Sequence, residues 1–123
     1  MGGRGGLSGV SEGSAISRPL VNAINARPNA KAIKVPGHAY MEVGTPDNLA
    51  VVDAVAYWLE AKQPGEQPDV IQTKRLKEWH DAGAVVGIVY SKTEGLAIID
   101  GDAATRAECL ARCRFDRLTK QPK

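Results

Sequence analysis

The feature that most constrains the fold is an uninterrupted apolar run, residues 84–90, that follows Gly83. A run of this length is far shorter than the ~20 residues of a membrane helix and is typical of a buried strand. A strand without polar positions has both faces covered, so helices must pack on both sides of its sheet. Such a strand is expected at the centre of the sheet or beside a parallel neighbour. The run therefore predicts an α/β protein.

Size and composition fit a single globular domain. The chain has 123 residues, of which 43% are hydrophobic and 24% are charged, and its net charge is +2. That charge neither requires nor excludes a nucleic-acid partner, because a local basic stripe is enough to bind phosphates. The Gly-rich start, residues 1–7, lacks the apolar segment of a secretory signal. We therefore expect a cytoplasmic protein in which Cys109 and Cys113 remain free thiols.

Caps, turn residues and alternating apolar positions predict the remaining elements. Residues 1–14 are rich in glycine and serine and are expected to be flexible. We predict, in chain order, a helix over 17–26, strands over 32–35, 48–52 and 55–62, a helix over 69–82, the strand over 84–90, a short strand over 95–99 and a helix over 103–114. Ser17 is the expected N-cap of the first helix, with Pro19 in its first turn. The order αβββαβ predicts a mixed sheet flanked by helices, with the domain core over 15–100 and a C-terminal helix and basic tail over 101–123.

The predicted hairpin of the second and third strands brings two carboxylates and one lysine together. Glu60 and Lys62 are two residues apart on one strand, so their side chains share a face. Tyr57, Leu59 and Ala61 take the other face and can fill the core. Asp47 precedes the second strand and therefore lies at the same open end of the hairpin.

Phosphodiester hydrolysis needs such a set of residues. Two carboxylates suit Mg²⁺ or Mn²⁺, and the backbone carbonyl of Ala61 can add a third ligand. Lys62 would hold or activate the attacking water and stabilise charge on the phosphate. Each short motif alone usually has a plainer meaning, because Glu-x-Lys on a strand is commonly two solvated charges and Pro-Asp is commonly a turn. The combination predicts a metal-dependent nuclease with Asp47, Glu60 and Lys62 as catalytic residues.

The helix over 69–82 supplies further candidates. Gln72 shares a face with Leu76 and Trp79, so its amide needs a partner, either the carboxylate site, a bound water or a backbone group. We count Gln72 among the catalytic residues. The candidates for substrate binding are Lys74 and Arg75 on this helix and Lys34 before the site, with His38 and Tyr40 in the intervening loop. For any single basic residue, a solvated surface position is an equally good interpretation.

The segment from Lys34 to Tyr90 carries a longer pattern. In order it contains Lys34 and Gly37, Gly44-Thr45-Pro46-Asp47, Glu60-Ala61-Lys62, Pro64-Gly65, Gln72, and Gly83 before the Val-rich strand. This pattern resembles the VRR-NUC group of the PD-(D/E)-x-K nucleases, in particular its small phage-encoded members. The resemblance implies a restriction-endonuclease-like core that cleaves DNA with Mg²⁺ or Mn²⁺. It also adds Gly37 to the substrate-binding residues.

The resemblance carries further expectations and one departure. Small members of this kind act on branched, flapped or Holliday-junction DNA in repair or recombination, and a homodimer would suit cleavage of two strands. The cytoplasm of a bacterium or of a phage-infected cell is the implied setting. The family often has a metal-site glutamate on its first helix, where this chain has Ser17, so either Glu42 is the third metal ligand or no third acid is needed. A non-catalytic nucleic-acid-binding protein on the same fold, or a small interaction module, remains the alternative function.

Overall fold

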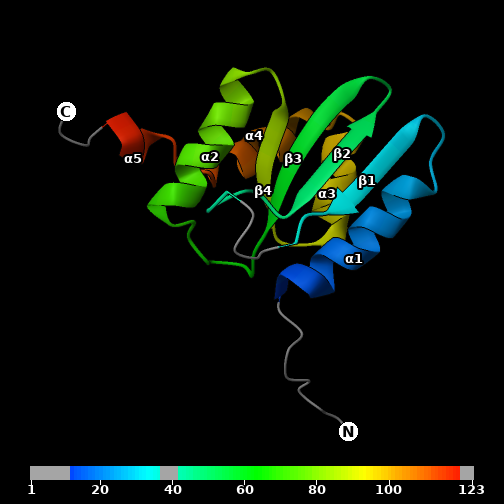
Figure 1. The fold of residues 1–123 in the computed structure, drawn as a ribbon, viewed down its shortest axis with the longest axis horizontal. Coiled ribbons are helices and arrows are strands. Elements are labelled where there is room, and N and C mark those ends of the chain that lie inside the picture. Colours follow the sequence, from blue (N-terminus) through cyan, green and yellow to red (C-terminus); the bar gives the residue numbers. More distant parts are fainter. Residues whose placement is uncertain (1–11, 37–41, 120–123) are drawn as a thin grey trace, which may run out of the picture.

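The computed structural model describes residues 12–36 and 42–119. Side chains are described for residues 15–36 and 42–118. A four-stranded sheet in the order β1-β2-β3-β4 forms its centre (Figure 1). The strands are β1 (Ala30–Lys34), β2 (Asn48–Val52), β3 (Val55–Ala61) and β4 (Val85–Val89), and the helices are α1 (Glu12–Asn25), α2 (Val70–Asp81), α3 (Lys92–Ile99), α4 (Ala103–Ala111) and α5 (Asp116–Thr119). Strand β2 is antiparallel to β1 and to β3, and β4 is parallel to β3. The mixed α/β fold predicted from the sequence is confirmed.

The apolar run forms β4, which pairs with β3 so that Ile88 lies opposite Glu60. Its parallel pairing agrees with the prediction, but β4 is the last strand in the sheet order rather than a central one. Ile88 and Val89 are nevertheless fully buried, because α2 and α4 pack against the strand. Helices that cover both faces of β4 therefore explain the absence of polar positions.

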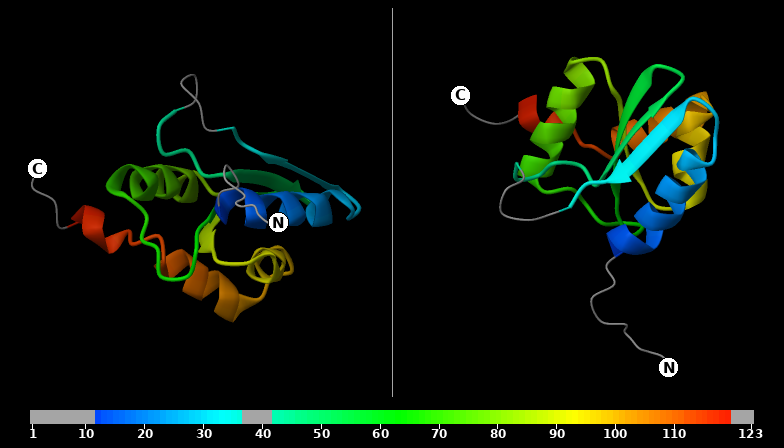
Figure 2. Two further views of the ribbon diagram at one scale, coloured as in Figure 1. Left: turned by 90° about the horizontal axis from the view of Figure 1, so that it is seen from below. Right: turned by 45° about the vertical axis from the view of Figure 1, so that its right-hand side comes forward.

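Alternate residues of β3 enter two separate cores. Leu59 packs with Leu20 and Ile24 of α1 on one face of the sheet. Trp58 packs with Leu76 of α2 on the other face. In the left view of Figure 2, α3 and α4 lie on the opposite side of the sheet from the loop that leads into β2. The period of two along a strand thus sends every second residue of β3 toward α2.

The first helix begins earlier than predicted. It starts at Glu12, so Ser17 is an internal, fully buried residue rather than the N-cap, and Pro19 lies inside the helix rather than in its first turn. Leu20 and Ile24 are buried, and their packing against the sheet stabilises the helix despite the proline. Pro19 itself is exposed. Its missing N–H leaves a backbone carbonyl of the preceding turn without a donor, and water can donate to that carbonyl instead.

The second difference concerns residues 95–99, which form the second half of α3 instead of a short strand. Ser91 is the N-cap of this helix and accepts a hydrogen bond from the Glu94 N–H at 3.1 Å. Gly95 allows α3 to approach α1, because a Cβ at this position would lie 2.7 Å from Leu20 Cδ1. The apolar residues that resembled a strand are therefore the buried face of a helix.

The C-terminal region also differs in detail. The predicted helix over 103–114 ends at Ala111, and α5 follows a residue, Arg114, with a left-handed φ of 60°. Cys109 and Cys113 are buried free thiols, as predicted. None of the described helices is both long and apolar enough to cross a lipid bilayer.

Candidate metal and catalytic site

The hairpin places Asp47 and Glu60 in direct contact. Asp53 and Ala54 form its turn with φ values of 48° and 70°, and the resulting register sets Asn48 opposite Leu59. The backbone N–H of Asp47 donates to Glu60 Oε1 at 3.1 Å, and the N–H of Ala61 donates to Asp47 Oδ2 at 3.2 Å. Each carboxylate therefore accepts a hydrogen bond from the opposite strand, which holds both acids at the open end of the hairpin.

Lys62 joins the two acids from the end of β3. Its Nζ lies 3.9 Å from Glu60 Oε2, and the exposed fractions of the two side chains are 15% and 5%. The N–H of Lys62 donates to the Val89 carbonyl at 3.0 Å, so β4 fixes the backbone at this point. In a strand, the N–H and C=O of one residue point to the same side. The carbonyl of Ala61 consequently faces the same side as its N–H, which is the side of Asp47.

Gln72 reaches the same carboxylate from the first turn of α2. Its Nε2 donates to Glu60 Oε2 at 3.1 Å, so the carboxylate supplies the partner that its position on an apolar face requires. Its Oε1 accepts from the N–H of Asp69, while Asp69 Oδ1 accepts from the N–H of Gln72. This reciprocal capping box orients the glutamine. Reasoning from the sequence missed this box, although the spacing Asp-x-x-Gln at the start of a predicted helix is its signal.

Two aromatic residues pack between β3 and α2. Trp58 shares the α2-facing side of β3 with Glu60, and its ring packs against Trp79 with the centroids 4.6 Å apart. Trp79 is 37% exposed, so it lies at the margin of this core rather than inside it. Trp79 lies with Ala54 and Val55 at the turn of the hairpin, so this pair fixes α2 on the sheet at the end away from the two carboxylates.

Burial makes the site electrostatically demanding. Removal from water raises the pKa of Asp47, and the hydrogen bond from Ala61 and the charges of Lys34 and Lys62 only partly oppose this effect. Burial, followed by the charge of Asp47, raises the pKa of Glu60 to about 8 against the opposing charge of Lys62. The partial removal of Asp47 from water and the burial of Glu60 disfavour ionisation of both acids together, despite the charges of Lys34 and Lys62, and a bound cation would relieve this cost. Carboxylate and carbonyl oxygens that share such a position fit a hard divalent cation.

Glu42 does not join the two acids. Its carboxylate is 59% exposed and lies 3.3 Å from Nε of Arg75. Within residues 12–36 and 42–119, no group of three or more Asp, Glu, His or Cys side chains is placed to hold a metal ion. The residues that fit an ion are therefore Asp47, Glu60 and the carbonyl of Ala61.

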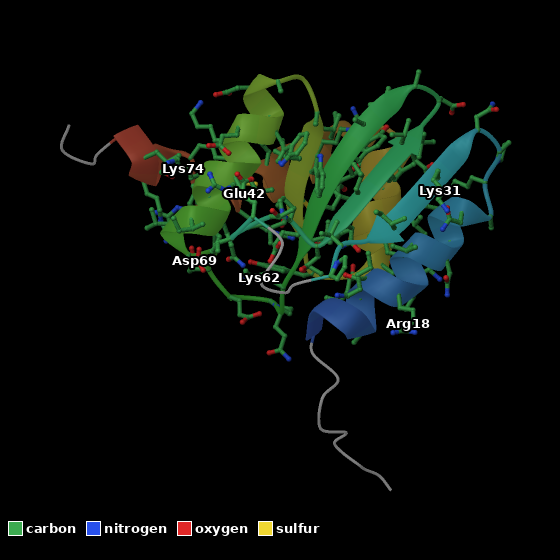
Figure 3. The ribbon with its side chains drawn as sticks, in the orientation of Figure 1. Arg18, Lys31, Glu42, Lys62, Asp69 and Lys74 are labelled. Carbon is green, nitrogen blue, oxygen red and sulfur yellow. The ribbon has the colours of Figure 1, made fainter. Side chains whose placement is uncertain are left out.

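The predicted substrate-binding residues have different surroundings. Lys34 ends β1 opposite Asn48, beside the site. Arg75 donates to the Val43 carbonyl at 3.1 Å and pairs with Glu78, so it ties the loop before β2 to α2. Lys74 is exposed on α2, further from the start of that helix than Asp69 (Figure 3). Gly37, together with His38 and Tyr40, lies outside the described residues.

The comparisons with known proteins support the fold. No family model and no curated protein matches the sequence. Among solved structures, a VRR_NUC domain matches with a TM-score of 0.61 and 19% identity over 75% of this chain and 98% of that chain. Hjc, a Holliday junction resolvase from Archaeoglobus fulgidus, matches with a TM-score of 0.48 and 20% identity over 62% of this chain and 65% of that chain. This chain therefore shares the fold of a VRR_NUC domain, as the sequence pattern from Lys34 to Gly83 indicated.

Proposed function

We propose that the protein is a divalent-metal-dependent nuclease that hydrolyses DNA phosphodiester bonds. The observation that carries this proposal is the reciprocal hydrogen bonding of Asp47 and Glu60 with Lys62 beside them. Asp47, Glu60 and the Ala61 carbonyl would hold Mg²⁺ or Mn²⁺. A bound ion supplies positive charge to polarise the phosphoryl oxygen and acidify water. The likeness of fold to a VRR_NUC domain supports the same reaction class.

The chain's own residues have distinct tasks in this proposal. The Lys62 ammonium holds the attacking water and stabilises negative charge that develops on the phosphate. Gln72 donates to Glu60 Oε2 and keeps that carboxylate turned toward Asp47. Lys34, Lys74 and Gly37 are the proposed contacts to the DNA backbone, and Arg75 contributes indirectly because its guanidinium is engaged with Val43, Glu42 and Glu78.

A cleavage panel with a matched lysine pair tests the proposal. Linear, flapped and four-way DNA are incubated with wild type, Lys62→Met and Lys31→Met in Mg²⁺ or Mn²⁺. Lys31 is an exposed residue of β1, so its loss is expected to leave cleavage unchanged. We expect wild type to cut, branched substrates being preferred, and Lys62→Met to be slower by at least about 100-fold. Binding without cleavage by wild type would instead indicate a DNA-binding protein, and no binding at low salt an interaction module.

Metal binding is tested separately from turnover. Glu60→Gln removes a charged oxygen ligand but keeps an acceptor for the Asp47 N–H, and Asp47→Asn does the same for the Ala61 N–H. We expect both variants to fold and to bind Mn²⁺ at least about 10-fold more weakly in calorimetric titration at constant pH. Unchanged Mn²⁺ affinity in both would contradict the assignment of these ligands.

The proposed partners are DNA and a second copy of the chain. A homodimer is inferred from the resemblance of the sequence pattern, since two sites related by a two-fold axis suit cleavage of two strands. Sedimentation of the free protein measures this directly, and a monomeric mass across the micromolar range would contradict it.

A further inference from the structure

The residues after α4 contact the loop that connects Lys62 to α2. We call residues 113–118 the C-terminal segment. Nη1 of Arg114 donates to Gln67 Oε1 at 3.1 Å, and Nη1 of Arg117 donates to the Pro68 carbonyl at 2.6 Å. Gln67 and Pro68 immediately precede Asp69, which is the N-cap of α2. Two arginines distant in sequence therefore bind the two residues that lead into the helix that carries Gln72.

The same segment also holds α2 from its other side. The Thr73 hydroxyl donates to the Cys113 carbonyl at 2.9 Å, and both residues are fully buried. Thr73 is the residue after Gln72, so this bond fixes the backbone next to the glutamine. Further along α2, the Phe115 ring lies 5.4 Å from the His80 ring. Figure 1 shows α5 beside α2, at the end where that helix begins.

The backbone of the C-terminal segment has an uncommon conformation at Arg114. Arg114 adopts a left-handed φ of 60°, which side-chain-bearing residues rarely do. This conformation turns the chain between Cys113 and α5, and it allows Arg114 and Arg117 to reach the loop before α2 together. The turn is thus held in place by bonds to the loop and to Thr73.

We propose that Thr73, Arg114 and Arg117 are positioning residues that set the distance between Gln72 and Glu60. Gln72 reaches Glu60 by one hydrogen bond of 3.1 Å, and its backbone belongs to a helix that is not part of the sheet. A small displacement of the first turn of α2 would break this bond. The expected loss of cleavage rests on the proposed nuclease function. The expected loss of the hydrogen bond between Gln72 and Glu60 does not.

The basic residues have a competing role, because a C-terminal arginine can also neutralise a DNA phosphate. Nη1 of Arg114 and of Arg117 already donates to a protein oxygen, so a phosphate would have to bind the remaining N–H groups of each guanidinium. The two roles predict different effects of substitution. Loss of a phosphate contact weakens DNA binding and lowers its salt dependence by about one unit of slope per arginine. Loss of a positioning contact leaves both quantities unchanged.

The first experiment reads the position of Gln72 without any substrate. The side-chain amide resonances of ¹⁵N-labelled protein are recorded, with Gln72→Ala identifying the Gln72 signal. We expect that signal to shift and to exchange faster with solvent in Thr73→Val and in the double variant Arg114→Met/Arg117→Met. Thr73→Ser keeps the hydroxyl, so its Gln72 signal is expected to match that of wild type. Arg27→Met removes an exposed ion pair with Asp100 elsewhere on the molecule and is the matched control, with no expected shift.

The second experiment measures cleavage by the same variants. We expect kcat to fall by about 10-fold to 100-fold while DNA affinity and its salt dependence stay unchanged. Adding Gln72→Ala to these variants is expected to cause no further loss, because both changes act through one contact. An unmoved Gln72 signal, or weaker binding with a lower salt slope, would overturn the positioning role. If wild type does not cleave DNA, the nuclease proposal fails, and the Gln72 signal still decides the positioning role. If Thr73→Val does not fold, the arginine variant provides the same test.

Discussion

Glu60 is the residue on which the contacts of the site converge. It accepts hydrogen bonds from the Asp47 N–H and from Gln72 Nε2, lies 3.9 Å from Lys62 Nζ, and is only 4% exposed. A buried carboxylate is costly unless charge and hydrogen bonds compensate it. Three separate parts of the chain supply that compensation, so this carboxylate is held in one position.

Ser17 and Asn48 are the residues whose polar atoms lack such compensation. Among the described side chains, Ser17 Oγ and Asn48 Oδ1 are buried without a hydrogen-bond partner. Asn48 still donates from Nδ2 to the Leu59 carbonyl at 3.1 Å, so only one of its two polar atoms is unsatisfied. Ser17 gains no such bond inside the helix and is therefore the better residue to replace.

We predict that Ser17→Ala stabilises the protein. Alanine removes an unpaired buried hydroxyl and has a higher helix propensity, so the free energy of unfolding should rise by about 1 kcal/mol. Urea denaturation measures the change. Ser91→Ala is the control of opposite sign, because it removes the N-cap of α3 and should cost about 1 kcal/mol. A loss of stability in Ser17→Ala would show that the hydroxyl has a partner.

At the scale of elements, the loop before β2 packs directly on the first turn of α2. Gly44 has a φ of +85°, and a Cβ there would lie 2.5 Å from Ile71 Cγ2 and 3.0 Å from the Ile71 carbonyl carbon. Arg75 reinforces the contact from the same helix by its bond to the Val43 carbonyl. The Gly44-Thr45-Pro46-Asp47 sequence therefore docks the helix as well as presenting the aspartate.

We predict that Gly44→Ala destabilises the protein more than Gly65→Ala does. Both glycines have a left-handed φ, but nothing lies within 4 Å of a Cβ at Gly65. Gly65→Ala should therefore cost only the conformational penalty, about 1 kcal/mol. Gly44→Ala adds a clash with backbone and should cost a further 1–3 kcal/mol, roughly the cost of overpacking. Equal losses in urea denaturation would contradict the close approach of loop and helix.

At the scale of the whole molecule, Arg112 connects β4, α3 and α4. Its guanidinium donates to the Ile88 carbonyl at 3.1 Å and to both carboxylate oxygens of Glu94, at 2.7 and 2.8 Å. It also lies 3.8 Å from the centre of the Tyr90 ring. The hydrogen bond from Arg112 lowers the pKa of Glu94 below its ordinary value of 4.5. This pair therefore couples the C-terminal helices to the sheet.

We predict that this ion pair makes stability depend on pH on the acid side. Because the folded-state pKa of Glu94 is depressed, its contribution is complete above pH 4.5 and is lost as the pH falls through the folded-state value. Glu94→Gln should lower the free energy of unfolding by about 2 kcal/mol at pH 7. The difference between variant and wild type should shrink as the pH falls below 4.5. A difference that is the same at pH 7 and pH 3 would contradict the role of the charged carboxylate.

Local sequence determined the hairpin and the helix that carry the site. The strand predicted over 48–52 coincides with β2, Asp53 and Ala54 form the turn of the predicted hairpin, and the helix predicted over 69–82 is α2 with Asp69 as its N-cap. These features depend on side chains close together in the chain, and antiparallel pairing then places Asp47 beside Glu60 without further information. For Gln72, the sequence indicated only that its amide needs a partner, either the carboxylate site, a water or a backbone group, and the tertiary structure selects Glu60.

Tertiary contacts decided the rest, because their energies come from residues far apart in sequence. Helix α1 begins at Glu12 and residues 95–99 belong to a helix, although local patterns favoured other outcomes, and Leu20 and Ile98 of these two helices share one core. Helices α2 and α4 cover β4, so a strand with an apolar sequence lies at one end of the sheet order. Arg75 holds Glu42 away from the two acids, and the C-terminal segment holds the first turn of α2. The identity of the site residues was thus encoded locally, whereas their support was set by long-range burial and hydrogen bonding.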